Sequence, residues 1–459
     1  MGAKETLAPS LPLWCSVPIS AVVAIGILYL LFRMRSTAGR FLVFACWFRF
    51  LIAAFKQYSY NPSPAGLSWI ALSSIGLVGL GALILDKRRF FIWPFFPVLI
   101  VCGLMLISAF MNHNPIGCIE PIVRNFFFVM ITVALWQTLD SEGPEALTRL
   151  LWVFVLPIAL QICSIVLNVP KAGEADGSVS YIGGYNHEQL FSMILASCFV
   201  LACFATQLRR WVKVAVSIVS LVGIAAANYR TTILGMAPLA AAQLLTGVPA
   251  AMKGSQRAFV RTAIIVFGVL SLAVAGAADP TRFGDLATVA TKGTSIIKPP
   301  ESFSSDDRRL LSGRPYIWSN YIYAYYKGTR VQKIFGFGPD SWSTLFDFYA
   351  HNTLVSYLYE LGILGVAAIL LVWGTMLSVA WRVQRKLRVQ VLAAHASFFL
   401  LNMATMPHWQ IEGNILYGLI CGYTLANARA RRSVPQGQGS WSRTGGLGPS
   451  SIAVPAPAR

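Results

Sequence analysis

The sequence predicts an all-α, polytopic membrane protein with about twelve or thirteen transmembrane helices. Hydrophobic residues make up 56% of the 459 residues and charged residues only 12%, about half the charged share of an ordinary soluble domain. Apolar runs of roughly 15–22 residues recur along the chain, which is about the length that crosses a bilayer as a helix. These runs are continuous rather than alternating, so helices are favoured over a barrel.

The predicted spans follow one another with polar connections between them. They cover residues 12–32, 41–55, 66–85, 91–110, 122–139, 150–168, 189–207, 212–227, 231–247, 259–278, 352–380, 390–406 and 414–427. The run 41–55 is short and carries Arg49 in its middle. If that run is interfacial or broken, the count falls to twelve and the N-terminus changes sides; the sequence leaves both alternatives open. We expect no cleaved signal peptide before the first run.

The net charge of +19 arises from 37 Lys and Arg against 18 Asp and Glu. Such a charge can indicate nucleic-acid binding, but here the basic residues cluster in alternate short connections, a pattern that marks the cytoplasmic side of a membrane protein. We therefore expect no nucleic-acid partner. The pattern places the C-terminus in the cytoplasm, and it places outside the connections 56–65, 111–121, 169–188, 228–231, 279–351 and 407–413.

Four regions follow from this layout: N-terminal transmembrane helices in 1–278, a long external loop in 279–351, C-terminal transmembrane helices in 352–428, and a tail in 429–459. The tail is rich in Gly, Ser and Pro, and we expect it to be disordered. The loop is too long for a simple connector. Within it, residues 314–335 are predicted to be helical, FGFGP at 335–339 to form a turn, and 340–350 to hold a second short helix.

Metal, disulfide and nucleotide sites are not expected. Seven of the eight cysteines fall inside apolar runs without a paired spacing, so they are interpreted as buried apolar residues rather than a disulfide framework. His113, His395 and His408 have no partners at metal-ligand spacing. The glycine-rich GFGP lacks the lysine of a phosphate-binding loop. We therefore predict no metal ion, no nucleotide and no other cofactor.

Three polar residues stand at predicted external membrane boundaries: Arg230, Arg314 and His351. Taken singly, each has an ordinary explanation, namely a snorkelling arginine, a solvated loop charge and a polar residue at a helix start. Together they suit an anionic lipid headgroup. Arginine presents a planar fork to phosphate oxygens, and histidine can accept a proton from a hydroxyl near neutral pH.

Other polar residues are weaker candidates. Asn186, His187 and Asn352 are possible substrate contacts. Arg124 is either a third diphosphate contact or the partner of Glu120 in a structural ion pair.

Two charged residues lie deep within predicted spans. We expect Glu360 and Arg49 to pair inside the bundle, and a structural role is favoured over catalysis because a charge at that depth needs a partner.

Four sequence blocks, taken in order and spacing, resemble the O-antigen ligase and O-antigen polymerase superfamily of bacterial envelope proteins. The blocks are GGYNHEQLF at 183–191, NYRTT at 228–232, LSGRPYIW at 311–318 followed by GFGP at 336–339, and HNTLVSYLYELGILG at 351–365. In NYRTT, Asn228 and Tyr229 stand where the family usually has a serine, which affects the geometry of that turn rather than its arginine.

The resemblance implies a GT-C-like helical fold in the bacterial inner membrane and an inverting, metal-independent glycosyltransferase. The donor would be a glycan on undecaprenyl diphosphate, presented at the periplasmic face among the membrane lipids. His351 would be the base or the group that orients the acceptor. Arg230 and Arg314 would bind the diphosphate.

The acceptor defines the alternatives. We expect a ligase that transfers O-antigen to lipid A–core in lipopolysaccharide biosynthesis; a polymerase that extends a polysaccharide uses the same chemistry. A protein O-oligosaccharyltransferase is a further alternative. A polysaccharide transporter belongs to another class, and the sequence lacks the paired interrupted spans that would indicate it.

Overall fold

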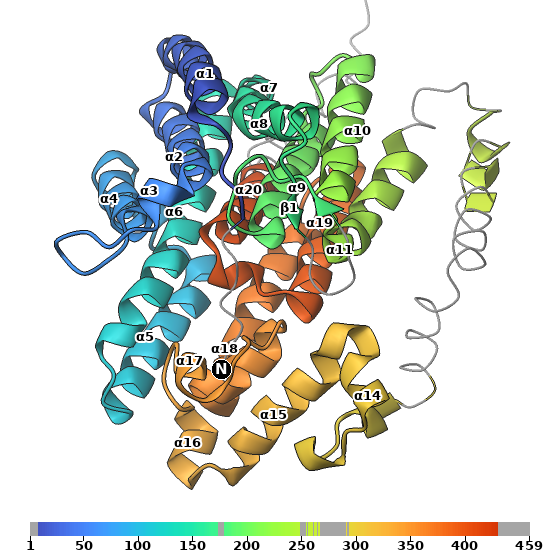
Figure 1. The fold of residues 1–459 in the computed structure, drawn as a ribbon. Coiled ribbons are helices and arrows are strands. Elements are labelled where there is room, and N and C mark those ends of the chain that lie inside the picture. Colours follow the sequence, from blue (N-terminus) through green and yellow to red (C-terminus); the bar gives the residue numbers. More distant parts are fainter. Residues whose placement is uncertain are drawn as a thin grey trace, which may run out of the picture.

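The computed structural model describes residues 8–172, 179–247 and 293–429, together with isolated positions between 254 and 291. These residues form a bundle of helices (Figure 1). Strands β1 (Lys171–Ala172) and β2 (Val179–Ser180) pair as a short antiparallel hairpin. Seven helices in the described part are long and apolar enough to cross a membrane. The chain is an all-α membrane protein, as the sequence predicts.

Every predicted apolar run coincides with a helix except 259–278, which lies largely outside the described residues, as does 430–459 of the tail. The run 41–55, for which a broken helix was an alternative, belongs to one continuous helix. The main helices are α1 (Leu13–Arg33), α2 (Thr37–Ala54), α4 (Trp69–Ile84), α5 (Phe96–Met111), α6 (Ile119–Glu142), α8 (Val155–Val166), α9 (Glu188–Phe204), α10 (Arg210–Ala226), α11 (Arg230–Ala242), α18 (Thr353–Trp381), α19 (Arg385–Ala404) and α20 (Ile411–Arg429). Short helices α3 (Lys56–Ser59) and α7 (Glu145–Leu150) lie between them.

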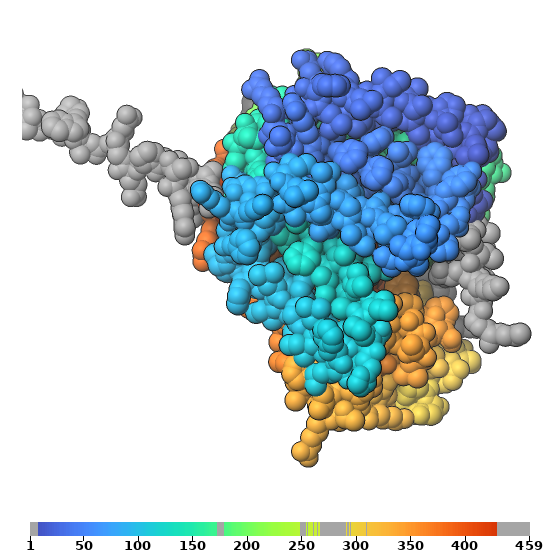
Figure 2. All heavy atoms as spheres, turned by 90° about the vertical axis from the view of Figure 1, so that its left-hand side faces the viewer, coloured from blue at the N-terminus to red at the C-terminus, as the bar shows by residue number. Residues whose placement is uncertain are grey.

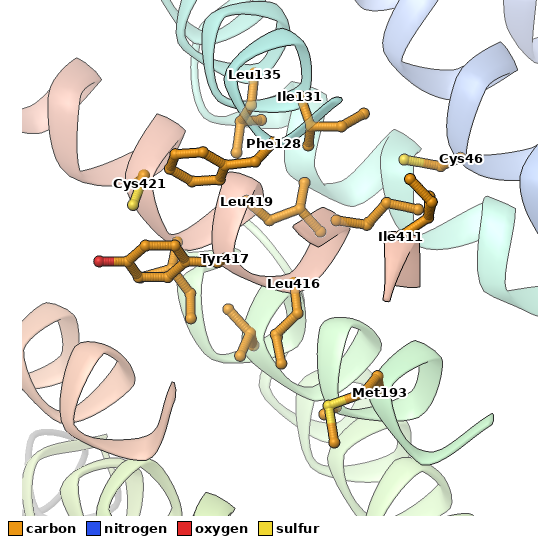
Figure 3. Close-up of a cluster of buried hydrophobic side chains, with 14 of the residues drawn as sticks. Cys46, Phe128, Ile131, Leu135, Met193, Ile411, Leu416, Tyr417, Leu419 and Cys421 are labelled. Atoms are coloured by element: carbon orange, nitrogen blue, oxygen red, sulfur yellow. The ribbon is translucent and has the colours of Figure 1, made fainter. Parts of the chain in front are cut away.

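The core of the bundle is the contact between α6 and α20. The ring of Phe128 stacks on that of Tyr417 with centroids 5.2 Å apart, and Figure 3 shows Phe128, Ile131 and Leu135 beside the labelled side chains of α20. Gly422 permits the close approach, because a Cβ there would lie 2.7 Å from the carbonyl oxygen of Thr132. Small residues at such contacts are typical of helices packed in a membrane.

Several predicted external connections contact one another, and we call the region that they form with residues 293–351 the loop end. Figure 2 shows the yellow and orange segment that follows residue 293 at this end. Three hydrogen bonds join connections that are distant in sequence: Lys56 Nζ to the carbonyl of Tyr185 (3.3 Å), Asn112 Nδ2 to the carbonyl of Gly336 (3.1 Å), and Arg314 Nη2 to Oγ1 of Thr231 (3.1 Å).

Predicted cytoplasmic connections meet at other contacts. The guanidinium of Arg89 contacts Asp140 at 2.6 Å. The carboxylate of Glu142 binds Arg149 at 2.7 Å and accepts the backbone N–H of Ser36 at 2.9 Å. The grouping of connections into two sets therefore agrees with the charge pattern.

The loop itself differs from the prediction in one respect. Residues 314–335 form two helices rather than one, α15 (Arg314–Lys327) and α16 (Arg330–Phe335). The break follows from Gly328 and from a capping box in which Thr329 and Gln332 satisfy each other's backbone N–H groups. Helix α14 (Ser305–Arg309) precedes this pair in the sequence. Helix α17 (Trp342–Leu345) follows the pair and is the short helix expected in 340–350.

Helix α18 is interrupted where the sequence predicts a continuous span. Gly362 has φ 69° and ψ −166°, a conformation that only glycine adopts readily. The turn after α16 inserts there: the N–H groups of Phe337 and Gly338 donate to the carbonyls of Tyr359 and Glu360, both at 3.0 Å. A Cβ on Gly362 would overlap the backbone of Ile334. The break leaves carbonyl groups of α18 without helical partners, and backbone N–H groups of the loop hydrogen-bond to them instead.

The predicted pairing of Arg49 with Glu360 is wrong. Arg49 on α2 pairs with Glu412 at 2.8 Å and also donates to Ser74 and to the carbonyl of Ile70. Both charged side chains are buried, so Arg49 has the predicted structural role with another partner. Glu360 lies on the face of α18 that meets the inserted turn, which is why the two never meet.

The expectation of unpaired cysteines is also wrong for one pair. A disulfide joins Cys15 on α1 to Cys163 on α8, which are 148 residues apart in sequence. The remaining six cysteines are free and buried. The pairing depends on how α1 packs on α8, which no local spacing reveals.

Candidate functional site

His351 lies at the end of a segment, 348–351, that two elements of the loop end hold from opposite sides. From α15, the hydroxyl of Tyr321 donates to the carbonyl of Phe348 at 2.9 Å, and the indole of Trp318 donates to the carbonyl of Ala350 at 2.8 Å. From α9, Gln189 accepts the hydroxyl of Tyr349 at 2.8 Å. The segment is therefore fixed directly before α18 begins.

The backbone of His351 adopts a left-handed conformation with φ 50°. Such a conformation costs a non-glycine residue on the order of 1–3 kcal/mol, and it is kept only where the surroundings impose it. The imidazole packs against the ring of Tyr349 with centroids 4.0 Å apart. Its Nδ1 is buried and has no hydrogen-bond partner among the described residues.

Burial, the positive charge of Arg314 and the neighbouring His187 lower the pKa of His351 to about 3. Each cause acts in the same direction, because desolvation and nearby positive charge both disfavour the imidazolium. The ring is therefore neutral at pH 7 and keeps a lone pair that can accept a proton.

His187 caps the start of α9. Its Nδ1 accepts the backbone N–H of Gln189 at 3.0 Å, so the proton of the neutral ring lies on Nε2. Next to it, the carboxylate of Glu188 accepts Lys171 Nζ and the hydroxyl of Ser180, both at 2.8 Å. The β1–β2 hairpin is thereby tied to α9, and the negative charge of Glu188 is neutralised within the site.

Arg314 is the first residue of α15 and follows Gly313, whose φ of 80° sets the sharp entry into the helix. Its guanidinium reaches Thr231, the second residue of α11. Arg230, the first residue of α11, is exposed directly beside this contact. Arg314 therefore contacts the residue that follows Arg230, although the two arginines are 84 positions apart in the sequence.

Four helices begin around this cluster: α9, α11, α15 and α18. The start of a helix carries partial positive charge and backbone N–H groups without intrahelical partners. Gly313 caps α15 and has no side chain that could occupy those groups. The starts of α9 and α18 are capped by His187 and Asn352, but those of α11 and α15 have no side-chain cap. Together with Arg230 and Arg314, these two uncapped starts make this a place where an anion would be stabilised.

Comparison with known proteins does not assign the chain to a family. No family model matches it, and no curated protein does.

The other predicted residues are distributed as follows. Asn186 is half-buried immediately before His187. Asn352, predicted as a possible substrate contact, is the cap of α18: its oxygen accepts the N–H groups of Leu354 and Val355, and its Nδ2 donates to the carbonyl of Met403. Asn352 therefore has a structural role at the start of α18, and its contact with a substrate stays a prediction.

Arg124 forms the ion pair with Glu120 that was one of its two predicted roles. Its guanidinium lies 5.9 Å from the ring centroid of Trp409. Glu360 is buried and accepts hydrogen bonds from the backbone of Asp340 and the hydroxyl of Ser356. Neither Arg124 nor Glu360 takes part in the hydrogen bonds that hold residues 348–351.

Sequence reasoning missed Gln189, Thr231 and Tyr349, although the first two lie inside blocks that it singled out. The charged and imidazole side chains next to them were chosen as candidates instead. A buried amide or hydroxyl becomes informative only when its partner is known. Among the described residues, no group of three or more His, Cys, Asp or Glu side chains could hold a metal ion.

The site thus combines a neutral imidazole with two guanidinium groups and two uncapped helix starts. A neutral imidazole can act as a general base, and guanidinium groups with helix starts can stabilise negative charge that develops on a leaving group. The arrangement suits transfer chemistry in which a proton is removed from one reactant while an anion departs from the other.

Proposed function

We propose that the protein is an inverting glycosyltransferase that moves a glycan from undecaprenyl diphosphate to an acceptor hydroxyl. The observation that carries the proposal is that neutral His351 lies near Arg314, which in turn bonds to Thr231 beside Arg230 at the uncapped start of α11. The predicted acceptor is lipid A–core, which makes the protein an O-antigen ligase.

The proposed setting is the bacterial inner membrane. The chain would cross it about twelve or thirteen times in a GT-C-like arrangement. The basic connections lie on the cytoplasmic side in this proposal, and the loop end faces the periplasm. An isoprenoid diphosphate would then bind with its tail in the bilayer and its two phosphates at the loop end.

The reaction is a single displacement. His351 takes the proton of the acceptor hydroxyl while the oxygen of that hydroxyl forms a bond to the anomeric carbon of the donor sugar. The bond between that carbon and the phosphate oxygen breaks, and its electron pair leaves with undecaprenyl diphosphate. Because attack and departure occur on opposite faces of the carbon, the anomeric configuration inverts. Arg230 and Arg314 stabilise the charge that develops on the leaving diphosphate.

Binding of the donor would also strengthen the base. In the protein alone, Arg314 contributes to the low pKa of His351. A diphosphate beside Arg314 offsets that positive charge and places negative charge near the imidazole. Both changes raise the pKa of His351, so the base becomes more effective when the donor is in place.

The test is transfer by purified protein in liposomes that contain an undecaprenyl-diphosphate glycan, with EDTA and without nucleotide. Lipid A–core is present in one sample and absent from the other. Product that requires lipid A–core supports the ligase. Longer lipid-linked glycans in both samples identify a polymerase, and the absence of any transfer by folded protein contradicts the proposal.

His351→Ala should reduce transfer by at least about 100-fold, the scale of general-base catalysis. His113→Ala is the matched control, because His113 is also a loop histidine with positive φ (56°) but is exposed at the end of α5. Retention of full activity by His351→Ala would remove His351 from the mechanism.

A further inference from the structure

Gln189 occupies the position between the two histidines of the site. Its backbone N–H donates to Nδ1 of His187 at 3.0 Å, and its side-chain Oε1 accepts the hydroxyl of Tyr349 at 2.8 Å. The residue is completely buried. A single residue at the start of α9 therefore contacts one imidazole directly and the other through a tyrosine.

The link from Gln189 to His351 passes through the ring of Tyr349. That ring lies against the imidazole with centroids 4.0 Å apart and an interplanar angle of 36°. Trp342 also packs edge-on against Tyr349, with ring centroids 6.1 Å apart. The hydroxyl bond to Gln189 fixes the distal end of the ring, so it limits how the ring can tilt against His351.

His351 depends on this support. Its Nδ1 makes no hydrogen bond within the described part of the chain, so no polar partner of Nδ1 orients the imidazole. Its left-handed backbone also excludes the usual helical or extended placement of the side chain. Packing against Tyr349 is therefore a contact that restricts the orientation of the ring.

Stability alone does not explain a glutamine here. The Nε2 of Gln189 is buried without a partner among the described residues, and burial of an unsatisfied amide group is unfavourable. The next residues of α9, Leu190 and Phe191, are apolar and buried. The packing of α9 on α11 has a hydroxyl pair of its own, Ser192 with Thr232 at 2.9 Å.

We propose that Gln189 is a positioning residue that holds the His351 imidazole in its reactive orientation through Tyr349. The inference rests on the proposed function of His351 as the base. It adds a connection, through Gln189 and Tyr349, between His187 at the start of α9 and His351 in the segment before α18.

The kinetic test uses Gln189→Met and Tyr349→Phe in the liposome transfer assay. Methionine keeps the length of the side chain but cannot accept the tyrosine hydroxyl, and phenylalanine keeps the ring but loses the hydroxyl. We expect each variant to lower kcat by about 10- to 100-fold, the cost of a small misplacement of a reacting group, with KM changed less than about threefold. Because both remove the same hydrogen bond, the double variant should be no slower than the slower single variant.

Tyr325→Phe is the matched control. Its hydroxyl donates to the carbonyl of Lys333 at 2.9 Å in the same loop, between α15 and α16. Activity close to wild type is expected for this variant. Additive losses in the Gln189→Met, Tyr349→Phe double variant would show two independent structural effects and would overturn the proposal.

A second readout does not depend on transfer. Deuterium exchange at C2 of each histidine, measured by mass spectrometry across pH, reports the pKa and environment of the individual ring. Gln189→Met and Tyr349→Phe should shift the exchange profile of His351 in the same direction and leave that of His113 unchanged. An unaltered His351 profile in both variants would overturn the positioning role, whereas failure of transfer in the wild-type protein would instead count against the proposed function.

Discussion

The Glu360 carboxylate accepts the backbone N–H of Asp340 at 2.9 Å. This hydrogen bond connects the first half of α18 to the loop that leads to His351. The other carboxylate oxygen accepts the hydroxyl of Ser356 at 3.0 Å, so both oxygens have partners in a side chain that is completely buried. Glu360 therefore holds the loop against the broken helix without itself contacting the base.

Two replacements of Glu360 should separate the contribution of its hydrogen-bond acceptor to stability from the contribution of its charge. Glu360→Ala leaves the N–H of Asp340 without its acceptor, and we expect a loss of about 1–3 kcal/mol in the free energy of unfolding. Glu360→Gln should lose much less, because its oxygen can accept from Asp340 while its amide donates to the hydroxyl of Ser356. Thermal unfolding in detergent compares the two. Equal destabilisation by both variants would mean that the charge, rather than the acceptor, matters.

The break in α18 gives a second stability test. Gly362→Ala should destabilise the protein by more than about 1 kcal/mol, because a Cβ at this position would overlap the backbone of Ile334 and φ is positive. Gly374→Ala in the same helix is the control, since no heavy atom lies within 4 Å of its added Cβ. That variant should be neutral or stabilising by up to about 1 kcal/mol. Melting curves that ranked the two the other way would contradict the inserted-turn geometry.

The pH dependence of transfer follows from the low pKa of His351. The base must be neutral, so activity is lost as pH falls through its pKa; burial, Arg314 and His187 lower that pKa to about 3. The acid limb of kcat/KM, which reports the free enzyme, should therefore lie well below the ordinary histidine value of about 6.5. The acid limb of kcat should lie at higher pH, because the bound diphosphate raises the pKa.

Arg314→Gln provides the check on this assignment. Removal of the positive charge should shift the acid limb of kcat/KM to higher pH, even though the overall rate falls. A pH–rate profile of the variant that keeps its acid limb in place, or moves it to lower pH, would show that the limb does not belong to His351.

The arginines can be tested by a substitution that keeps their charge. Arg230→Lys and Arg314→Lys should each lower kcat/KM by about 10- to 100-fold, since a point charge replaces a fork that can hold two phosphate oxygens. Arg330→Lys is the matched control for Arg314→Lys, because Arg330 is likewise the first residue of a loop helix and is exposed. Transfer at the wild-type rate by either site variant would reduce that arginine to a membrane-interface residue.

Much of the fold follows from the sequence because long apolar runs leave few alternatives in a membrane. The runs predicted the helices, and the basic clusters predicted which connections lie together. Arg230, Arg314 and His351 were singled out because charged and titratable groups at span boundaries are uncommon. Their meeting at one site is consistent with the interpretation that they act together.

The sequence did not reveal which polar residues pair with each other. Arg49 could pair with any buried carboxylate, and only the fold, which brings Glu412 at the start of α20 to 2.8 Å from it, selects Glu412 over Glu360. The interruption at Gly362 is hidden because a glycine inside an apolar run also occurs in continuous helices. Gln189 and Tyr349 are ordinary residues until the 2.8 Å bond between them is seen.

The cap of α18 has a consequence for the order of events during synthesis. All the residues of the site have been synthesised once residue 351 has been made, but the amide of Asn352 donates to the carbonyl of Met403, and Thr353 donates to Asn402. These two contacts at the start of α18 therefore form only after α19 has been inserted beside it. A nascent chain that ends before α19 would carry every residue of the candidate site without these contacts, so we expect the site to be completed only when insertion of the chain is almost finished.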